Sequence, residues 1–279
     1  MSALTFLPAG FTPGVLAMLL IIVGASALMS GLSGFGFSAI GALSLWLLPP
    51  KLGVPLLMGL STANQLLSIG QLKADMRPLN EWWPDGPGPY LLGGLVGVPV
   101  GLAILHSLPT GSLMAIFGAF LVVYAAYSML KPQTLRVTGT GSPVAGILVG
   151  ALGGVIGGFT AFPGAAVVVW TGLRQLSKSD SRAIVQPYIL AMQVLSISML
   201  AVQRPETFGG VYWSLMLVTV PVVLPCTLLG VYIYRLLSDV NFRRVAYMLL
   251  GTSGVGLLAK AAGALSTLGV IAAAAAAVR

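Results

Sequence analysis

Two hydrophobic stretches of this chain are each interrupted by a similar glycine-rich pattern. The first reads Gly31-Leu-Ser-Gly34-Phe-Gly-Phe-Ser38, and the second reads Gly154-Val-Ile-Gly157-Gly-Phe-Thr160-Ala-Phe-Pro163-Gly164. At a constant offset of 123 residues (154 − 31), identical residues stand opposite Gly31, Gly34, Gly41 and Ala42. After a five-residue insertion, Gln65-Leu-Leu-Ser-Ile69 matches Gln193-Val-Leu-Ser-Ile197. The chain is therefore predicted to fold as two related halves, each containing a broken helix, a pattern that points to a binding site in membrane transporters.

The composition indicates the class of protein in which these breaks lie. Hydrophobic residues make up 57% of the 279 positions and charged residues only 7%, so an ordinary soluble surface could not be built. Apolar runs of roughly 17 to 25 residues recur along the chain, the length that a helix needs to cross a bilayer. The net charge of +8 comes from basic residues spread through short loops, which argues against a nucleic-acid-binding face. The sequence predicts an all-α polytopic membrane protein.

Turn signals divide the chain into ten helical pieces. They are expected at residues 13–30, 36–48, 52–70, 88–106, 111–130, 143–156, 161–172, 183–202, 209–236 and 242–260. Residues 1–130 form the first membrane repeat, 131–142 a linker, and 143–279 the second repeat with a C-terminal alanine-rich helix. Each repeat holds five pieces and opens with a glycine-broken helical hairpin. Because five is an odd number, the second repeat enters the membrane from the opposite side, and the repeats are inverted.

The distribution of positive charge tests this topology. If the chain reverses at both glycine breaks, ten of the 14 Lys and Arg residues fall on one side; if the breaks lie inside continuous helices, the split is seven and seven. Because Lys and Arg are enriched in cytoplasmic loops, reversal is favoured and the N-terminus is expected in the periplasm. Hairpin arms of about 13 to 17 residues reach only about 20 to 25 Å. This length favours re-entrant hairpins over fully spanning ones, with tips that meet near the bilayer centre.

The hairpin tips combine groups that suit an anion. A helix begins after each glycine break, and the N–H groups at a helix N-terminus favour negative charge. Hydroxyls nearby can cap these helices or bind a ligand, and a proline suits their first turn. Close packing of membrane helices at glycine is the alternative explanation. The candidate residues are Ser33, Gly34, Phe35, Gly36 and Ser38 in the first hairpin and Gly157, Gly158, Thr160, Ala161, Phe162, Pro163 and Gly164 in the second.

Neutral polar side chains complete the candidate site. Asn64, Gln65 and Gln193 lie inside the third piece of each half, and the two glutamines occupy matching positions. They either line the site or tie helices together. All six acidic residues fall in loops or at helix ends, so no buried carboxylate relay is expected. His106 stands alone, and neither a metal site, a catalytic cluster nor a cofactor is expected.

The duplicated glycine motif, the Gln-x-Leu-Ser-Ile sequence and the two similar halves resemble the TauE/SafE family of bacterial membrane transporters. The likeness covers roughly Val15 to Lys260. It implies transport of a small sulfur-containing anion, such as sulfite, sulfoacetate or a related organosulfonate, across the inner membrane. The family motif falls on Gly31 to Gly41 and on Gly154 to Gly164, although Phe35 and Phe37 interrupt the consecutive glycines that the family tends to have.

These features predict a multi-pass secondary transporter of the bacterial inner membrane that works by alternating access around the paired hairpin tips. The alternative is a membrane-embedded scaffold or assembly factor without transport, and an enzyme is not expected. The expected partners are a small anionic substrate, the lipid bilayer and a second copy of the chain in a homodimer, whereas nucleic acid is not expected. The sequence leaves the coupling ion open, and it does not decide between elevator and rocking motions.

Overall fold

The protein is a bundle of helices in the computed structural model, which describes residues 12–71, 78–130, 142–234, 254–255, 257–259 and 261–263. Across these ranges all regular structure is helical. Seven of the helices are long and apolar enough to cross a membrane. The prediction of an all-α polytopic membrane protein is therefore confirmed. Most of the linker, of the tenth expected piece and of the alanine-rich tail lies outside the described residues.

The long helices correspond to the expected spanning pieces. They are α1 (Pro13–Ser33), α3 (Pro50–Gln71), α4 (Gly88–Ser107), α5 (Thr110–Leu130), α6 (Pro143–Thr160), α8 (Lys178–Gln203) and α9 (Gly210–Tyr234). The short elements are α2 (Phe37–Gly41), η2 (Ala42–Trp46), η4 (Leu79–Glu81), α7 (Gly164–Leu173) and η5 (Pro205–Phe208).

The two hairpins have arms of unequal length, and their second arms are shorter than the sequence predicts. The first arms, α1 and α6, are 21 and 18 residues long and run three and four residues past their expected ends (33 − 30 and 160 − 156). The second arms, residues 37–46 and 164–173, have ten residues each and reach only about 15 Å. By length, the first arm of each hairpin can cross the membrane and the second arm cannot.

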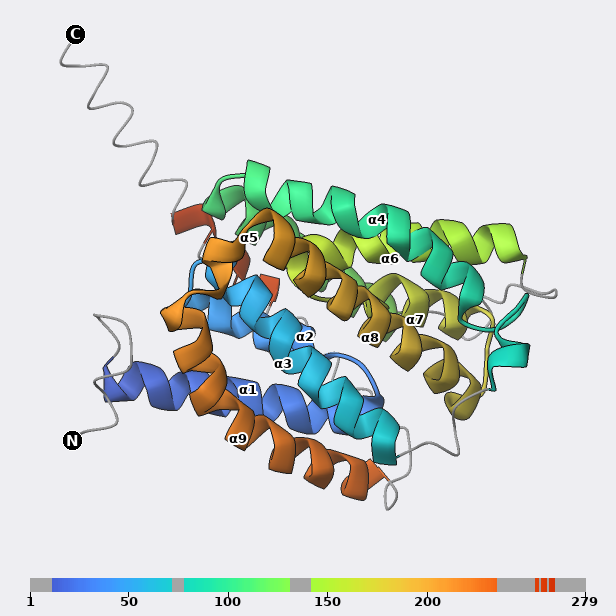
Figure 1. The fold of residues 1–279 in the computed structure, drawn as a ribbon, viewed down its shortest axis with the longest axis horizontal. Helices are drawn as coiled ribbons and strands as arrows, with labels where there is room; N and C mark the ends of the chain where they lie inside the picture. The colour runs from blue at the N-terminus through green and yellow to red at the C-terminus, as the bar shows by residue number, and fades with distance from the viewer. Residues whose placement is uncertain are drawn as a thin grey trace, which may run out of the picture.

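Each hairpin packs against the opposite half of the chain. α1 packs along α9, and α6 packs along α4, so each first arm lies on the fourth helix of the other half. In Figure 1, α4 and α6 lie on one side of the bundle, α1 and α9 lie on the opposite side, and α3 and α8 lie between them. This reciprocal packing is consistent with two related halves. The inversion of one half relative to the other stays a prediction.

Glycines let the backbones of α4 and α6 come into direct contact. A Cβ atom built on Gly154 would lie 2.7 Å from the carbonyl oxygen of Gly94, and one on Gly158 would lie 2.7 Å from the backbone nitrogen of Leu102. Small residues at every fourth position allow such close approach between membrane helices. The glycines of α6 therefore stay helical, because the neighbouring helix α4 packs closely against them. For this reason the breaks fall later than expected, at Gly34–Gly36 and at Ala161–Pro163.

We predict that Gly154→Ala destabilises the protein by about 1 to 3 kcal/mol, the usual cost of overpacking a well-packed interface. The matched control is Gly70→Ala, because a Cβ atom at Gly70 meets nothing within 4 Å and alanine is the better helix former. Thermal unfolding of the purified proteins should show a lower apparent melting temperature for the first variant only. Equal melting temperatures would contradict the close contact between α4 and α6.

Candidate functional site

Both first arms end in a residue with left-handed backbone conformation. Gly34 follows α1 with φ 79°, and Ala161 follows α6 with φ 59°. The N–H of Gly34 donates to the carbonyl oxygen of Ser30 at 2.7 Å, and the N–H of Ala161 donates to that of Gly157 at 2.8 Å. The two broken helices therefore close with the same type of C-terminal cap.

A serine or threonine hydroxyl stabilises the turn at each hairpin tip. The hydroxyls of Ser33 and Thr160 donate to the carbonyl four residues earlier, at 2.8 and 2.6 Å. They also accept hydrogen bonds from the N–H groups of Phe35 and Phe162, at 3.3 and 3.1 Å. α2 and α7 have no side-chain cap at their N-termini. Of the two roles expected for these hydroxyls, capping of the second arms is not observed, because the tip turn itself uses Ser33 and Thr160; ligand binding stays a prediction.

The shared geometry defines how the two tips correspond. Ser33, Gly34 and Phe35 play the roles of Thr160, Ala161 and Phe162, which is an offset of 127 residues (160 − 33). Identical glycines suggested an offset of 123, whereas the glutamines downstream differ by 128 (193 − 65). Most of the insertion in the second half therefore lies before the tip, and the expected alignment of the glycines is corrected.

A buried glutamine binds the backbone of each tip. The side-chain nitrogen of Gln65 on α3 donates to the carbonyl of Gly34 at 3.2 Å, and that of Gln193 on α8 donates to the carbonyl of Ala161 at 2.8 Å. Both side chains are 1% exposed. Their amide oxygens are also buried, and neither has a hydrogen-bond partner. The matching glutamines therefore satisfy the tip carbonyls and present unpaired acceptors beside them.

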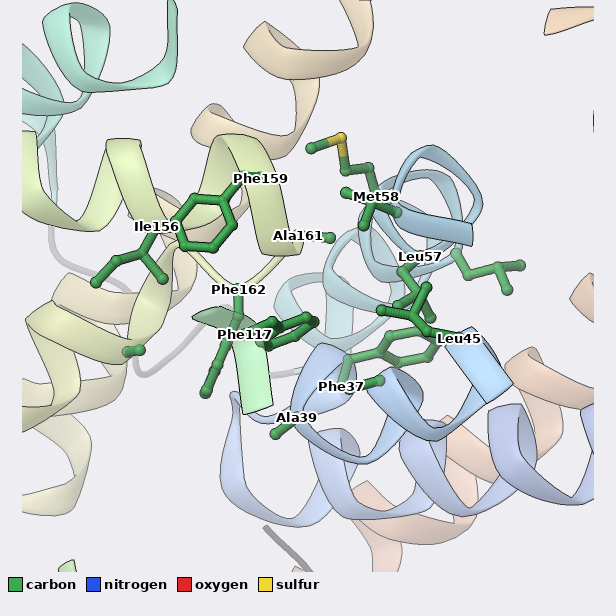
Figure 2. Packing of buried hydrophobic residues seen from close by; sticks show 14 of the residues in the cluster. Phe37, Ala39, Leu45, Leu57, Met58, Phe117, Ile156, Phe159, Ala161 and Phe162 are labelled. Carbon is green, nitrogen blue, oxygen red and sulfur yellow. The ribbon is translucent and has the colours of Figure 1, made fainter. Parts of the chain in front are cut away.

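The two tips meet directly. The hydroxyl of Ser38, just after the first break, donates to the carbonyl of Ala161 in the second tip, which also accepts the bond from Gln193. Figure 2 shows the buried hydrophobic residues around this junction, from Phe37 in the first hairpin to Phe162 in the second. The expectation that the tips come together is confirmed by this contact.

Asn64 has a different role from the glutamines. Its amide nitrogen donates to the hydroxyl of Ser30 on α1 at 2.7 Å, and its amide oxygen accepts from the hydroxyl of Thr227 on α9 at 2.7 Å. Both ends of the amide are thus used to join α1, α3 and α9. We therefore leave Asn64 out of the proposed binding site.

Several tip residues serve packing. The Phe162 ring makes edge-to-face contacts with Phe120 and Tyr124 of α5, at centroid distances of 6.4 and 5.8 Å. Phe35 is half-buried against the hydrophobic core, and Gly36 has φ 90°. Gly157 and Gly158 have no room for a side chain, since a Cβ atom on each would lie within 3 Å of Pro163 and of the backbone of Leu102; a Cβ atom on Gly164 would lie 2.6 Å from the end of the Ile189 side chain.

The structure adds Arg182 to the first tip. This side chain is 5% exposed, and its guanidinium donates to the carbonyls of Gly31 and Leu32 at 3.2 Å while lying 4.1 Å from the ring centroid of Tyr234. The expected helix began at residue 183, which left Arg182 in a loop. Ser177 caps α8 through the N–H of Asp180 at 3.0 Å, so the Ser-x-x-Asp sequence was a signal for the earlier start.

Gln186 is the second residue that the sequence analysis missed. It is 0% exposed, and neither its amide nitrogen nor its amide oxygen has a hydrogen-bond partner. Its position seven residues before Gln193 places both amides on the same face of α8. That spacing was the signal in the sequence. In the part of the chain that the structure describes, no group of three His, Cys, Asp or Glu residues could hold a metal ion.

Among the described residues, seven helices long and apolar enough to cross a membrane, with two broken hairpins that meet at buried amides, indicate a multi-pass membrane protein. The family model of the sulfite exporter TauE/SafE matches residues 17–257, and the chain belongs to this family. Members of the family are membrane transporters and not enzymes, which supports transport of anions in general. No curated protein and no solved structure matches the chain significantly.

The left-handed caps predict opposite effects for two substitutions. Gly34→Ala should destabilise the protein by about 1 to 2 kcal/mol because of backbone strain, and its Cβ atom would lie 2.6 Å from Nε of Arg182. Ala161→Gly should stabilise it by up to about 1 kcal/mol because glycine adopts this conformation without strain. Apparent melting temperatures of the purified variants check both changes. A lower melting temperature for Ala161→Gly would contradict the equivalence of the two tips.

Proposed function

We propose that this protein is a secondary transporter that moves a small sulfur-containing anion, such as sulfite, sulfoacetate or a related organosulfonate, across the bacterial inner membrane by alternating access. The family supports the class of substrate, and the charge distribution supports a periplasmic N-terminus. The observation that carries the proposed site is the pair of unpaired amide oxygens of Gln65 and Gln193 at the meeting point of the two tips.

Unpaired polar atoms in a buried position point to a ligand. Leaving a buried acceptor without a partner costs about 1 to 3 kcal/mol, and a substrate offsets this cost where it brings a hydrogen-bond donor, such as the proton of hydrogensulfite. The second tip adds the N-terminus of α7, which begins at Gly164 without a side-chain cap. The N–H groups in the first turn of a helix attract negative charge. The proposed site therefore lies between the glutamine amides and the start of α7.

The packing of the bundle suggests how access alternates. The α1–α9 pair carries the first hairpin, the α4–α6 pair carries the second, and the Ser38–Ala161 hydrogen bond connects the tips. In the proposed mechanism the pairs move relative to each other, and this hydrogen bond breaks and re-forms during the cycle. Substrate bound at the junction is then exposed first to one side of the membrane and then to the other.

The test is anion uptake into proteoliposomes by the wild-type protein and by a Gln65→Leu, Gln193→Leu double variant. Gln203→Leu, on the same helix as Gln193, is the matched control, because Gln203 is exposed. We expect the wild type and the control to take up labelled sulfite or sulfoacetate, and the double variant to fall to the level of liposomes without protein.

A binding measurement separates loss of the site from loss of the fold. Anion at about 100 times its dissociation constant should stabilise the wild type by about 2.7 kcal/mol, which raises its apparent melting temperature. The double variant should show a folded profile by size-exclusion chromatography but no such rise. If the double variant transports as well as the control does, the proposed site is wrong. If the wild type binds and transports none of these anions, the proposed substrate class is wrong.

A further inference from the structure

One face of α8 contacts both hairpins. Arg182, Gln186, Ile189 and Gln193 follow at intervals of four, three and four residues, so with about 3.6 residues per turn they project from one side of the helix. Arg182 binds the carbonyl end of α1 in the first hairpin. Ile189 contacts Gly164 and Gln193 binds Ala161, both in the second hairpin. Gln186 therefore lies between the contacts to the two hairpins.

The amide of Gln186 makes no hydrogen bond. Its side chain is 0% exposed, and both the nitrogen and the oxygen of its amide lack partners. A side-chain amide has two donors and can accept two hydrogen bonds. A buried amide with both ends unpaired costs free energy in any helical bundle. A ligand that both donates to it and accepts from it would satisfy it.

Among the three buried glutamine amides of α3 and α8, the unpaired atoms are mostly acceptors. The amide oxygens of Gln65, Gln186 and Gln193 are unpaired, whereas only the nitrogen of Gln186 is an unpaired amide donor. The orientations of Gln65 and Gln193 are fixed because their nitrogens face the carbonyls of the tips, and turning either amide over would bring two oxygens together. A ligand that has only acceptors would therefore find one donor and three acceptors among these amides.

We propose that this site selects a monoanion that carries its own hydrogen-bond donor, and that Gln186 determines this specificity. Hydrogensulfite and hydroxyl-bearing sulfonates have this chemistry, whereas sulfate, simple alkylsulfonates and the sulfoacetate dianion do not, so the proposal narrows the substrates named above. The proposal rests on the proposed transport function and narrows its substrate class. In the bound state the hydroxyl of the ligand donates to an amide oxygen, and an anionic oxygen accepts from the amide nitrogen of Gln186.

A bare cation fits the same atoms less well. Amide oxygens can coordinate Na⁺, but the unpaired nitrogen of Gln186 cannot. Among the described residues, the acidic side chains Glu81, Asp85, Asp180 and Glu206 lie in connections or at the start of a helix, so no carboxylate lies at the junction to balance a cation. The observations favour a ligand that has both donor and acceptor groups.

The experiment compares two sulfonates that differ by one hydroxyl. Binding of 2-hydroxyethanesulfonate and of ethanesulfonate to the purified protein is measured by thermal shift and calorimetry, in sodium and in choline buffers. We expect the hydroxyl to strengthen binding about tenfold or more, because a site built to bond a hydroxyl rejects an analogue without it. Sulfite should bind more weakly as rising pH removes the proton of hydrogensulfite.

The variant Gln186→Leu links this preference to the residue. Because the amide has no partner, leucine should leave the ligand-free melting temperature unchanged or higher, while the preference for the hydroxyl disappears. Gln203→Leu, at an exposed position of α8, should keep the preference. A lower ligand-free melting temperature for Gln186→Leu would show a structural role and overturn the proposal.

The remaining outcomes separate this inference from the transport function. If the wild type binds both sulfonates equally, the transport proposal stands and the donor requirement falls. If binding depends on sodium and not on the hydroxyl, the amide oxygens hold a cation and the inference is wrong. If neither sulfonate nor sulfite binds, the transport proposal fails together with it.

Discussion

The need to satisfy backbone groups in a hydrocarbon environment governs this structure. A helix that breaks inside a membrane leaves carbonyl and N–H groups that lipid cannot bond, so such a break must be buried in protein or line a polar site. Here each first arm ends in a left-handed cap, and a glutamine from α3 or α8 donates to the carbonyl of the capping residue. The position of the glutamines and the meeting of the tips follow from this requirement.

The reciprocal packing of the two halves brings these breaks together. α1 lies on α9 and α6 lies on α4, and glycine keeps the α4–α6 backbones close. The equivalence is incomplete, because the positions 128 residues before Arg182 and Gln186 are Val54 and Met58. The additional polar groups of α8 give the junction one chemically distinct wall. At the proposed site, a substrate between the two similar tips would therefore be held asymmetrically.

The sequence predicts the fold class well, because a helix in hydrocarbon needs a long apolar run and this chain shows such runs from end to end. It also identifies Gln65 and Gln193, since two amides at matching positions in apolar segments are conspicuous. It does not predict where the two first arms end. Glycine can break a helix or let two helices pack closely, and the position of the neighbouring helix decides which of these happens. Arg182 and Gln186 were not predicted as site residues for a related reason. Their burial depends on where α8 begins and on which face of α8 packs against the hairpins.

The location of the bound anion is the most direct test of the account. Crystals grown with selenite, a selenium analogue of sulfite, would show the anion by its anomalous scattering. The account predicts a peak at the junction of the two tips, within hydrogen-bond distance of the Gln65, Gln186 and Gln193 amides. A peak elsewhere in the bundle, with this junction empty at saturating selenite, would contradict it.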